Sequence, residues 1–297
     1  MPGLREPCAV TVVEVAPRDG LQNEAAVVPT DIKVAFINAL SDAGFPVIEC
    51  TSFVSPKAVP QLADAEDVMR QLRRRPGTRY LVLVPNERGL DRAVAVGCDA
   101  IALFTAASEA FSEANVHASI AETFTRFQPV ATRAQQLGLW MRGYVSTAFW
   151  CPYAGRILPE QVMPVVLRLF ELGCAEVALA DTIGRASPDE VAQLLDVVLR
   201  EVPAEQLALH FHDTNGLARA NIRVGLTYGI RVFDGSVGGL GGCPFAPGAP
   251  GNVATEAVLD ELDAAGCTHG IDRAALVRAR TLLATALPTV SHRTASA

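Results

Sequence analysis

The sequence lacks the features of membrane proteins and of nucleic-acid-binding proteins. No stretch approaches the roughly 18 uncharged apolar residues that a membrane-spanning helix needs, so we expect no membrane partner. Acidic residues outnumber basic ones, 32 against 25, and the one basic run, Arg73–Arg75, stands at the end of a predicted helix, where it would complement the helix dipole. Nucleic-acid binding normally needs a basic stripe, and we expect none.

Cysteine occurs without the spacing of a disulfide framework. The count is seven, which is odd, and no CxxC pair is present. This usage favours reduced thiols and a cytoplasmic location. The segment Met1 to Pro7 has no apolar core of a signal peptide, and strand-like sequence follows almost at once. We therefore expect neither a secretory signal nor a mitochondrial transit peptide.

Short apolar runs alternate with longer segments of 3.6-residue periodicity along the whole chain. Aromatic residues make up only 6% of the sequence and hydrophobic residues 50%, which suits buried parallel strands covered by helices. The strand-like runs are Ala9–Val15, Val47–Thr51, Tyr80–Val84, Ala100–Thr105, Trp140–Ser146, Glu176–Ala180, Ala208–Phe211 and Val232–Ser236. The clearest helical segments are Asp31–Ala43, Leu62–Arg74, Ile120–Leu137, Pro159–Leu172 and Asp189–Glu201.

This alternation predicts an α/β fold, a single-domain (β/α)8 TIM barrel. A length of 297 residues is ordinary for one such barrel, and no Pro/Gly/Ser linker divides the chain. We expect the domain to span residues 1–297, with a core at about 9–285 and a polar tail at 288–297. A doubly wound open sheet is the alternative, but no GxGxxG or GxxxxGK[ST] loop follows the first strand. In a barrel, the active site lies at the C-terminal ends of the strands.

Polar residues gather at that end of six predicted strands. They are Glu14, Arg18 and Asp19 for the first strand, Glu49 for the second, Arg142 and Tyr144 for the fifth, Asp181 and Thr182 for the sixth, His210 and His212 for the seventh, and Cys243 and Asn252 for the eighth. One such coincidence could be chance, but six predict that these residues surround one opening at the C-terminal ends of the strands, which we call the mouth of the barrel.

The pair His210 and His212 is the sharpest local feature. Residues i and i+2 of a strand face the same side, so two imidazoles could hold one divalent ion, although two ordinary histidines would give the same pattern. A carboxylate from Asp19 and an amide oxygen from Asn252 would complete a mixed nitrogen and oxygen set. Such a set favours Mg²⁺ or Mn²⁺ over structural zinc.

Arg18 and Cys243 each allow two interpretations. Arg18 could form an ion pair with Asp19 that closes a loop, or it could stabilise a developing oxyanion beside a metal-bound carboxylate. Cys243 could be an inert thiol, as lone cysteines usually are. Its segment, residues 238–251, is rich in glycine and proline, which indicates unusual dihedral angles or a loop that closes over a substrate. A thiol there could donate a proton.

The motifs resemble those of 3-hydroxy-3-methylglutaryl-CoA lyases, in order and over about residues 9–285. They are APRDGLQNE (16–24), IECTSFVSPKAVPQLAD (48–64), AASEAF (106–111), RGYVSTAFWCPYAG (142–155), DTIG (181–184), HFHDTNG (210–216) and GLGGCPFAPGAPGNVATE (239–256). The last is the most specific, because a cysteine in such a glycine loop marks that family. The resemblance implies cleavage of 3-hydroxy-3-methylglutaryl-CoA to acetyl-CoA and acetoacetate, and an acyl-CoA partner. Because barrels of this kind commonly associate, a homodimer is a separate expectation.

The same resemblance implies roles for individual residues. Asp19, His210, His212 and Asn252 would bind Mg²⁺ or Mn²⁺. The catalytic residues would be Arg18, over the thioester oxygen, with Asp19, Glu49, His210 and Cys243. Substrate would be bound and oriented by Gln22, Ser52, Arg142, Tyr144, Asp181 and Thr182. Glu14, Gln22 and Glu256 would support the site from behind.

The chain departs from the family pattern in the expected pocket wall rather than in the metal set. Ala25 stands where the family often has lysine after QNE, and Ala58 where it often has tryptophan after SPK. Before the DT pair, Ala178 and Ala180 replace the usual serine and glycine. After the fifth predicted strand, the bulky residues Phe149 and Trp150 stand where small residues are common. Two alternatives therefore stay open: the same chemistry on a different 3-hydroxyacyl-CoA, or a related synthase that uses acetyl-CoA and a 2-keto acid.

Overall fold

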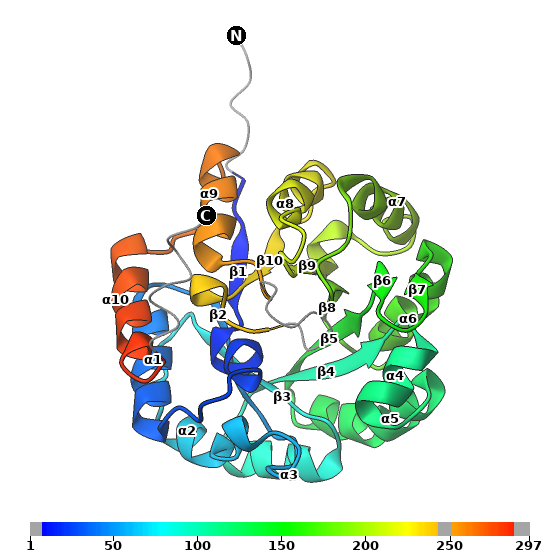
Figure 1. Cartoon of the computed structure of the whole chain (residues 1–297). Helices are drawn as coiled ribbons and strands as arrows, with labels where there is room; N and C mark the ends of the chain where they lie inside the picture. The colour runs from blue at the N-terminus through cyan, green and yellow to red at the C-terminus, as the bar shows by residue number, and fades with distance from the viewer. Residues whose placement is uncertain (1–7, 243–250, 288–297) are drawn as a thin grey trace.

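Eight parallel strands close into a barrel in the computed structural model, which describes residues 8–242 and 251–287 (Figure 1). The order around the barrel is β1-β10-β9-β8-β5-β4-β3-β2, and β1 pairs with both β2 and β10, which closes the sheet. The strands are β1 (Thr11–Glu14), β2 (Val47–Ser52), β3 (Arg79–Leu83), β4 (Ala100–Ala106), β5 (Trp140–Ser146), β8 (Glu176–Asp181), β9 (Leu207–Phe211) and β10 (Val232–Gly235). The predicted barrel is confirmed, and each strand overlaps its predicted run.

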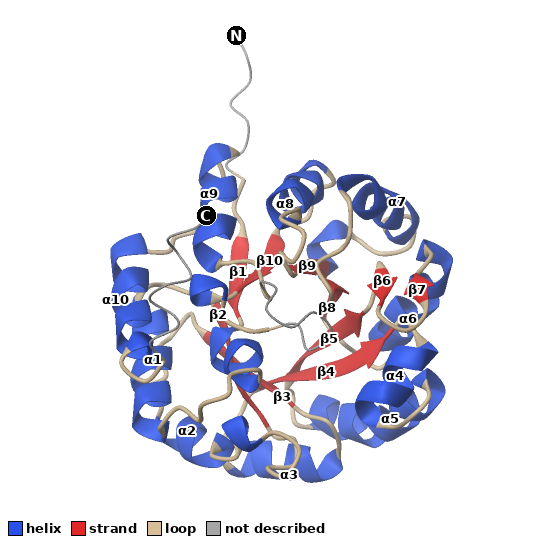
Figure 2. Ribbon diagram, viewed as in Figure 1, coloured by secondary structure: helices blue, strands red, loops and turns tan. Residues whose placement is uncertain are grey.

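Helices form an outer ring around these strands (Figure 2). They are α1 (Thr30–Asp42), α2 (Ala65–Gln71), α3 (Glu87–Ala95), α4 (Glu109–Val116), α5 (Ile120–Gln136), α6 (Pro159–Glu171), α7 (Pro188–Val198), α8 (Ala218–Thr227), α9 (Thr255–Ala264) and α10 (Arg273–Ala284). Local chemistry sets several starts: Ser119 and Ser187 form capping boxes, and Pro159 occupies the first position of α6. A short hairpin, β6 (Trp150–Cys151) and β7 (Gly155–Arg156), precedes α6. Among the described residues, no helix combines the length and the apolar character needed to cross a bilayer.

The prediction for the basic run Arg73–Arg75 was wrong in one respect. The helix before it, α2, ends at Gln71, and Leu72 is already extended, so the run does not complement its own helix dipole. Arg73 and Arg75 instead form ion pairs with Asp42, the last residue of α1, and Arg74 donates hydrogen bonds to carbonyl oxygens just beyond the C-terminal end of α3. The run therefore ties two neighbouring helix ends together.

The barrel has two apolar layers. The larger lies between strands and helices, and a smaller cluster fills the inside of the barrel with residues that include Val13, Leu81 and Ala178. Alanine is frequent in the inner cluster, at positions 100, 102, 178 and 208. These small side chains leave space inside the barrel for the fully buried guanidinium of Arg142. The interior thus carries a buried cation, Arg142, beneath the mouth, and this guanidinium contacts Asp234 and Tyr144.

Candidate active site

A turn after β1 carries Arg18 and Asp19 over the mouth of the barrel. Residues Ala16–Gly20 form one π-helical turn, in which the amides of Asp19 and Gly20 both donate to the carbonyl of Val15. Such turns are rare in proteins, and those that occur are often found at functional sites. A Cβ at position 20 would lie 3.0 Å from the Cβ of Leu240 and 3.1 Å from Oγ of Ser236, so any larger residue there would have to displace these neighbours. The turn therefore packs tightly and holds its two charged side chains in place.

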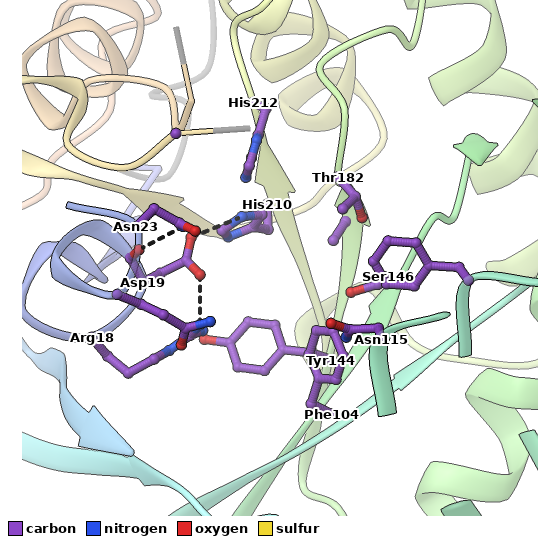
Figure 3. Close-up of a pocket in the computed structure, with 14 residues that line it drawn as sticks. Arg18, Asp19, Asn23, Phe104, Asn115, Tyr144, Ser146, Thr182, His210 and His212 are labelled. Atoms are coloured by element: carbon purple, nitrogen blue, oxygen red, sulfur yellow. Dashed lines mark hydrogen bonds and ion pairs between the residues drawn. The ribbon is translucent and has the colours of Figure 1, made fainter. Parts of the chain in front are cut away.

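Asp19, His210 and His212 converge at this mouth (Figure 3). Each offers one ligand atom, and these atoms lie within 4.8 Å of one another. Nε2 of His210 lies 4.0 Å from Oδ2 of Asp19, and the two imidazole centroids are 5.4 Å apart. The structure therefore brings the carboxylate of Asp19 close to the imidazoles of His210 and His212, as the sequence predicts.

Asn252 joins this cluster through backbone pairing and through its amide. It forms an antiparallel bridge with His212, and its Nδ2 donates to Oδ2 of Asp19 at 2.8 Å and to the carbonyl of Leu240 at 3.1 Å. Oδ1 of Asn252 and Nδ1 of His212 are buried and have no hydrogen-bond partner within the described chain. Buried polar atoms are normally satisfied. A divalent cation bound by a carboxylate, two imidazoles and an amide oxygen fits this donor set.

Two members of the cluster, Asp19 and His212, have the charge states that metal ligands require. For His210, burial lowers the pKa, but the hydrogen bond with Asp234 and the charges of Asp234 and Asp19 outweigh it and raise that pKa above its usual value. Burial raises the pKa of Asp19, but Arg18 and the two histidines outweigh it and hold that pKa well below its usual range. Burial, together with nearby His210, lowers the pKa of His212 to about 4, so the imidazole is neutral near pH 7. An ionised carboxylate and a neutral imidazole are the forms that bind a divalent ion.

Arg18 lies between two carboxylates. Its guanidinium is 2.5 Å from Oδ1 of Asp19 and 2.6 Å from Oε2 of Glu49, and it lies over the ring of Tyr144. Burial raises the pKa of Glu49 above its usual value, although Arg18 opposes this. Both interpretations of Arg18 keep support, because the ion pair exists and the side chain also lines the cavity beside the metal cluster.

Three predicted substrate-binding residues lie outside the cavities that surround the cluster. Arg142 is fully buried inside the barrel and contacts Asp234, Glu176 and the hydroxyl of Tyr144. Ser52 is buried and accepts from the amide of Val54. Asp181, whose pKa burial raises to about 6, accepts from the amides of Arg185 and Ala186 and so shapes the loop after β8. These side chains support the mouth without lining it.

Two adjacent cavities with shared wall residues lie at the mouth. The inner one, of about 130 Å³, is lined by Arg18, Asp19, Tyr144, Thr182, both histidines and other residues. The outer one, of about 570 Å³, shares Arg18, Gln22, Phe104 and Asn115 with it. Sequence reasoning missed Phe104, Asn115 and Ser146, which Figure 3 shows around the inner cavity. Their signal was available, since Phe104 and Ser146 lie at the C-terminal ends of β4 and β5.

The predicted supporting glutamates hold backbone near the mouth, whereas only some of the altered positions line a cavity. Glu14 is buried and accepts from two backbone amides and from the hydroxyl of Thr255, while Glu256 accepts from the amide of Gly238. Of the altered positions, Ala58 lines the outer cavity and Ala180 lines the inner one. Ala178 packs inside the barrel and Trp150 donates to Glu190, away from both cavities. Cys243 lies outside the described residues.

A family model described as HMGL-like matches residues 9–283 of this chain. The chain belongs to the HMGL-like family. Its similarity to individual proteins is also high. The 3-hydroxy-3-methylglutaryl-CoA lyase, cytoplasmic, of Mus musculus is 52% identical over 272 residues, which is 92% of this chain and 79% of the relative.

Solved structures of this family superimpose closely on the barrel. The HMG-CoA lyase from Brucella melitensis is 55% identical, with a TM-score of 0.91 and coverage of 93% of this chain and 98% of that one. An HMG-CoA lyase from Acinetobacter baumannii, in complex with coenzyme A and 3-methylmalate, is 40% identical, with a TM-score of 0.90 and coverage of 96% and 93%. These likenesses extend over nearly the whole chain, and the residues that the family model matches contain the turn after β1 and both histidines.

Proposed function

We propose that this HMGL-like protein is a divalent-metal-dependent carbon–carbon lyase that cleaves 3-hydroxy-3-methylglutaryl-CoA to acetyl-CoA and acetoacetate. One observation carries the proposal: Asp19, His210 and His212 form a cluster with metal-ligand spacing, next to the buried guanidinium of Arg18. The relatives named as HMG-CoA lyases support the same reaction.

Asp19, His210, His212 and Asn252 would hold Mg²⁺ or Mn²⁺. The mixture of carboxylate, imidazole and amide donors suits these ions, and the unpartnered Oδ1 of Asn252 is a further donor available to them. A divalent ion in this position would act as a Lewis acid and lower the pKa of the tertiary hydroxyl of the substrate. The side chains must then move two protons and balance one negative charge.

The cleavage is a retro-Claisen reaction. Asp19 or His210 removes the proton from the hydroxyl, the C2–C3 bond breaks, and its electron pair forms the enolate of the thioester while the hydroxyl carbon becomes a ketone. Arg18 balances the enolate charge, a type of stabilisation worth several kcal/mol in a site that excludes water. Cys243 or His210 then returns a proton to the carbon, which gives acetyl-CoA. Glu49 and Tyr144 hold the guanidinium of Arg18 in position.

The outer cavity would receive the acyl-CoA. Its volume of about 570 Å³ and its position next to the inner cavity, with which it shares Gln22 and Phe104, fit an extended thioester. The relative solved with coenzyme A supports this class of partner. Because Ala58 lines this cavity, the same chemistry on a different 3-hydroxyacyl-CoA is a second candidate. Kinetics on a panel of acyl-CoAs separate the two, since equal or better turnover of the methylglutaryl compound would exclude the second.

A coupled assay for acetyl-CoA release from 3-hydroxy-3-methylglutaryl-CoA tests the proposal. We expect rapid release with Mg²⁺ or Mn²⁺, loss of release with EDTA, and no release from His210→Ala or Asp19→Ala. Release that EDTA leaves intact would contradict the metal-dependent mechanism. Condensation of acetyl-CoA with a 2-keto acid, seen as release of free thiol, would instead support the synthase alternative.

Two further expectations concern the protein in the cell. We propose a cytoplasmic location, supported by the name of the mouse relative, and a homodimer, because barrels of this kind commonly associate. Cell fractionation tests the first expectation, and light scattering of the purified protein tests the second.

A further inference from the structure

Asp234 lies directly behind one of the two histidines of the cluster. Its Oδ2 is 3.0 Å from Nδ1 of His210, and its Oδ1 accepts a hydrogen bond from Arg142 at 2.6 Å. The carboxylate is buried and belongs to β10, whose other residues are apolar or glycine. The sequence motifs gave Asp234 no role, and it does not line either cavity at the mouth.

The contact with Asp234 decides which nitrogen of His210 carries hydrogen. An ionised carboxylate can only accept hydrogen bonds, so Nδ1 of His210 must be the donor. In the neutral imidazole the lone pair is then on Nε2, the atom that lies 4.0 Å from Oδ2 of Asp19. The ring therefore presents its basic nitrogen to the side where Asp19 and His212 converge.

Arg142 decides which atom of residue 234 faces His210. A guanidinium can only donate, so the atom of residue 234 that faces it must be an acceptor. Arg142 is itself immobilised by the hydroxyl of Tyr144, at 3.0 Å, and by Glu176, at 2.9 Å. The two oxygens of Asp234 therefore have fixed partners, one on Arg142 and the other on His210.

We propose that Asp234 is a positioning residue that holds His210 in the tautomer with hydrogen on Nδ1, so that Nε2 is the metal ligand. Arg142 supports this role by orienting Asp234, which gives the buried guanidinium a purpose other than contact with substrate. The proposal rests on the metal centre of the proposed function. It adds a residue to that centre and explains why a cation is buried inside the barrel. With Nε2 on the metal and hydrogen on Nδ1, His210 has no free lone pair, so this inference leaves Asp19 as the base of the proposed reaction.

The variant Asp234→Asn provides a test that keeps size and shape. Because Arg142 requires an acceptor, the amide oxygen of the variant faces Arg142 and its NH2 faces Nδ1 of His210. That NH2 can only donate, which places the ring hydrogen on Nε2 and removes the lone pair from the metal side. We expect the Kd for Mn²⁺, measured by electron paramagnetic resonance without substrate, to rise about 10- to 100-fold.

The variant Glu176→Gln is a matched control. It removes one carboxylate charge from the other side of Arg142 but keeps an amide oxygen that can accept from the guanidinium, so Arg142 stays in place, and it does not touch His210. We expect its Kd for Mn²⁺ to stay close to the wild-type value. Equal weakening in both variants would overturn the proposal, because loss of a buried charge would then explain the result without any role for the tautomer.

A second measurement does not depend on how the variants fold. In metal-free protein with ¹⁵N-labelled histidine, at a pH where the imidazoles are neutral, His210 should show hydrogen on Nδ1. Hydrogen on Nε2 of the wild type would overturn the proposal. Wild-type protein that fails to bind Mn²⁺ would instead contradict the metal centre of the proposed function. Wild-type binding with unchanged affinity in Asp234→Asn would overturn only the role of Asp234.

Discussion

Arg18 and Glu49 form a buried ion pair, with the guanidinium 2.6 Å from Oε2 of the carboxylate. The pair continues on both sides. Arg18 also contacts Asp19, and Glu49 accepts from the hydroxyl of Tyr144, which in turn accepts from Arg142. The charged groups at the mouth and inside the barrel are therefore one connected network. A substitution that leaves the metal ligands intact can still change the charge that the network presents to a substrate.

Replacement of Arg18 by glutamine should separate catalysis from metal binding. The variant removes the cation that would balance the enolate, so we expect kcat to fall about 10²- to 10³-fold. Mn²⁺ affinity should be kept, because Asp19 and both histidines remain. Steady-state kinetics and Mn²⁺ titration check the two expectations, with Arg70→Gln on the exposed face of α2 as a control. A change in KM alone would show that the assigned role of Arg18 is wrong.

Glu14 should make the stability of the barrel depend on pH. Burial raises the pKa of Glu14 from 4.5 to about 8, although Thr255 and two backbone amides favour its ionised form. The folded state therefore holds this proton more tightly than the unfolded chain. The resulting stabilisation is complete below pH 4.5 and is lost as the pH rises through about 8.

The variant Glu14→Gln removes this titration. The free energy of unfolding of the variant, relative to that of the wild type, should increase as the pH rises from 5 to 8, by at most about 1.4 kcal/mol per pH unit. Thermal midpoints of both proteins, measured in EDTA so that bound metal does not contribute, check the trend. Midpoint curves that stay parallel over this range would rule out the raised pKa.

The sequence predicts which face of a strand a residue occupies better than how deep that residue lies. Arg142 and Tyr144 are two positions apart on β5, so both point inward. Only the closed barrel shows that Tyr144 reaches the cavity and Arg142 lies beneath it. Asp19, His210, His212 and Asn252 could be placed together because barrel topology brings the C-terminal strand ends to one mouth. Asp234 gave no such signal, since its partners come from β5 and β9 and only the fold brings them together.

Ala58 should control access through the outer cavity. The variant Ala58→Glu adds a negative charge to the wall of a cavity of about 570 Å³ that lies next to the metal cluster but does not include it. Because this charge repels the phosphates of coenzyme A, we expect KM for the acyl-CoA to rise and kcat to change little. Ala63→Glu, at an exposed position that lines neither cavity, is the matched control. If both variants keep the wild-type KM, the outer cavity does not hold the thioester.

Gly241 and Gly242 offer the sharpest test of the role of Asn252. A Cβ on Gly241 would lie 2.7 Å from Nδ2 of Asn252, and this glycine has a φ of +113°, which L side chains rarely adopt. Among the described residues, a Cβ on Gly242 would meet only the Cβ of Asn23, at an ordinary 3.8 Å. Gly241→Ala must therefore displace the Asn252 amide from its contact with Asp19, whereas Gly242→Ala need not.

We expect Gly241→Ala to raise the Kd for Mn²⁺ about tenfold or more, as loss of a ligand or of its support does in other metal sites, and Gly242→Ala to leave it near the wild-type value. The strained backbone should also cost Gly241→Ala about 1–3 kcal/mol of stability. Thermal midpoints measured in EDTA isolate that cost, so any additional difference that Mn²⁺ produces between the variants reports on the metal centre. Equal Mn²⁺ affinities in the two variants would remove Asn252 from the ligand set and leave Asp19, His210 and His212 as its only side chains.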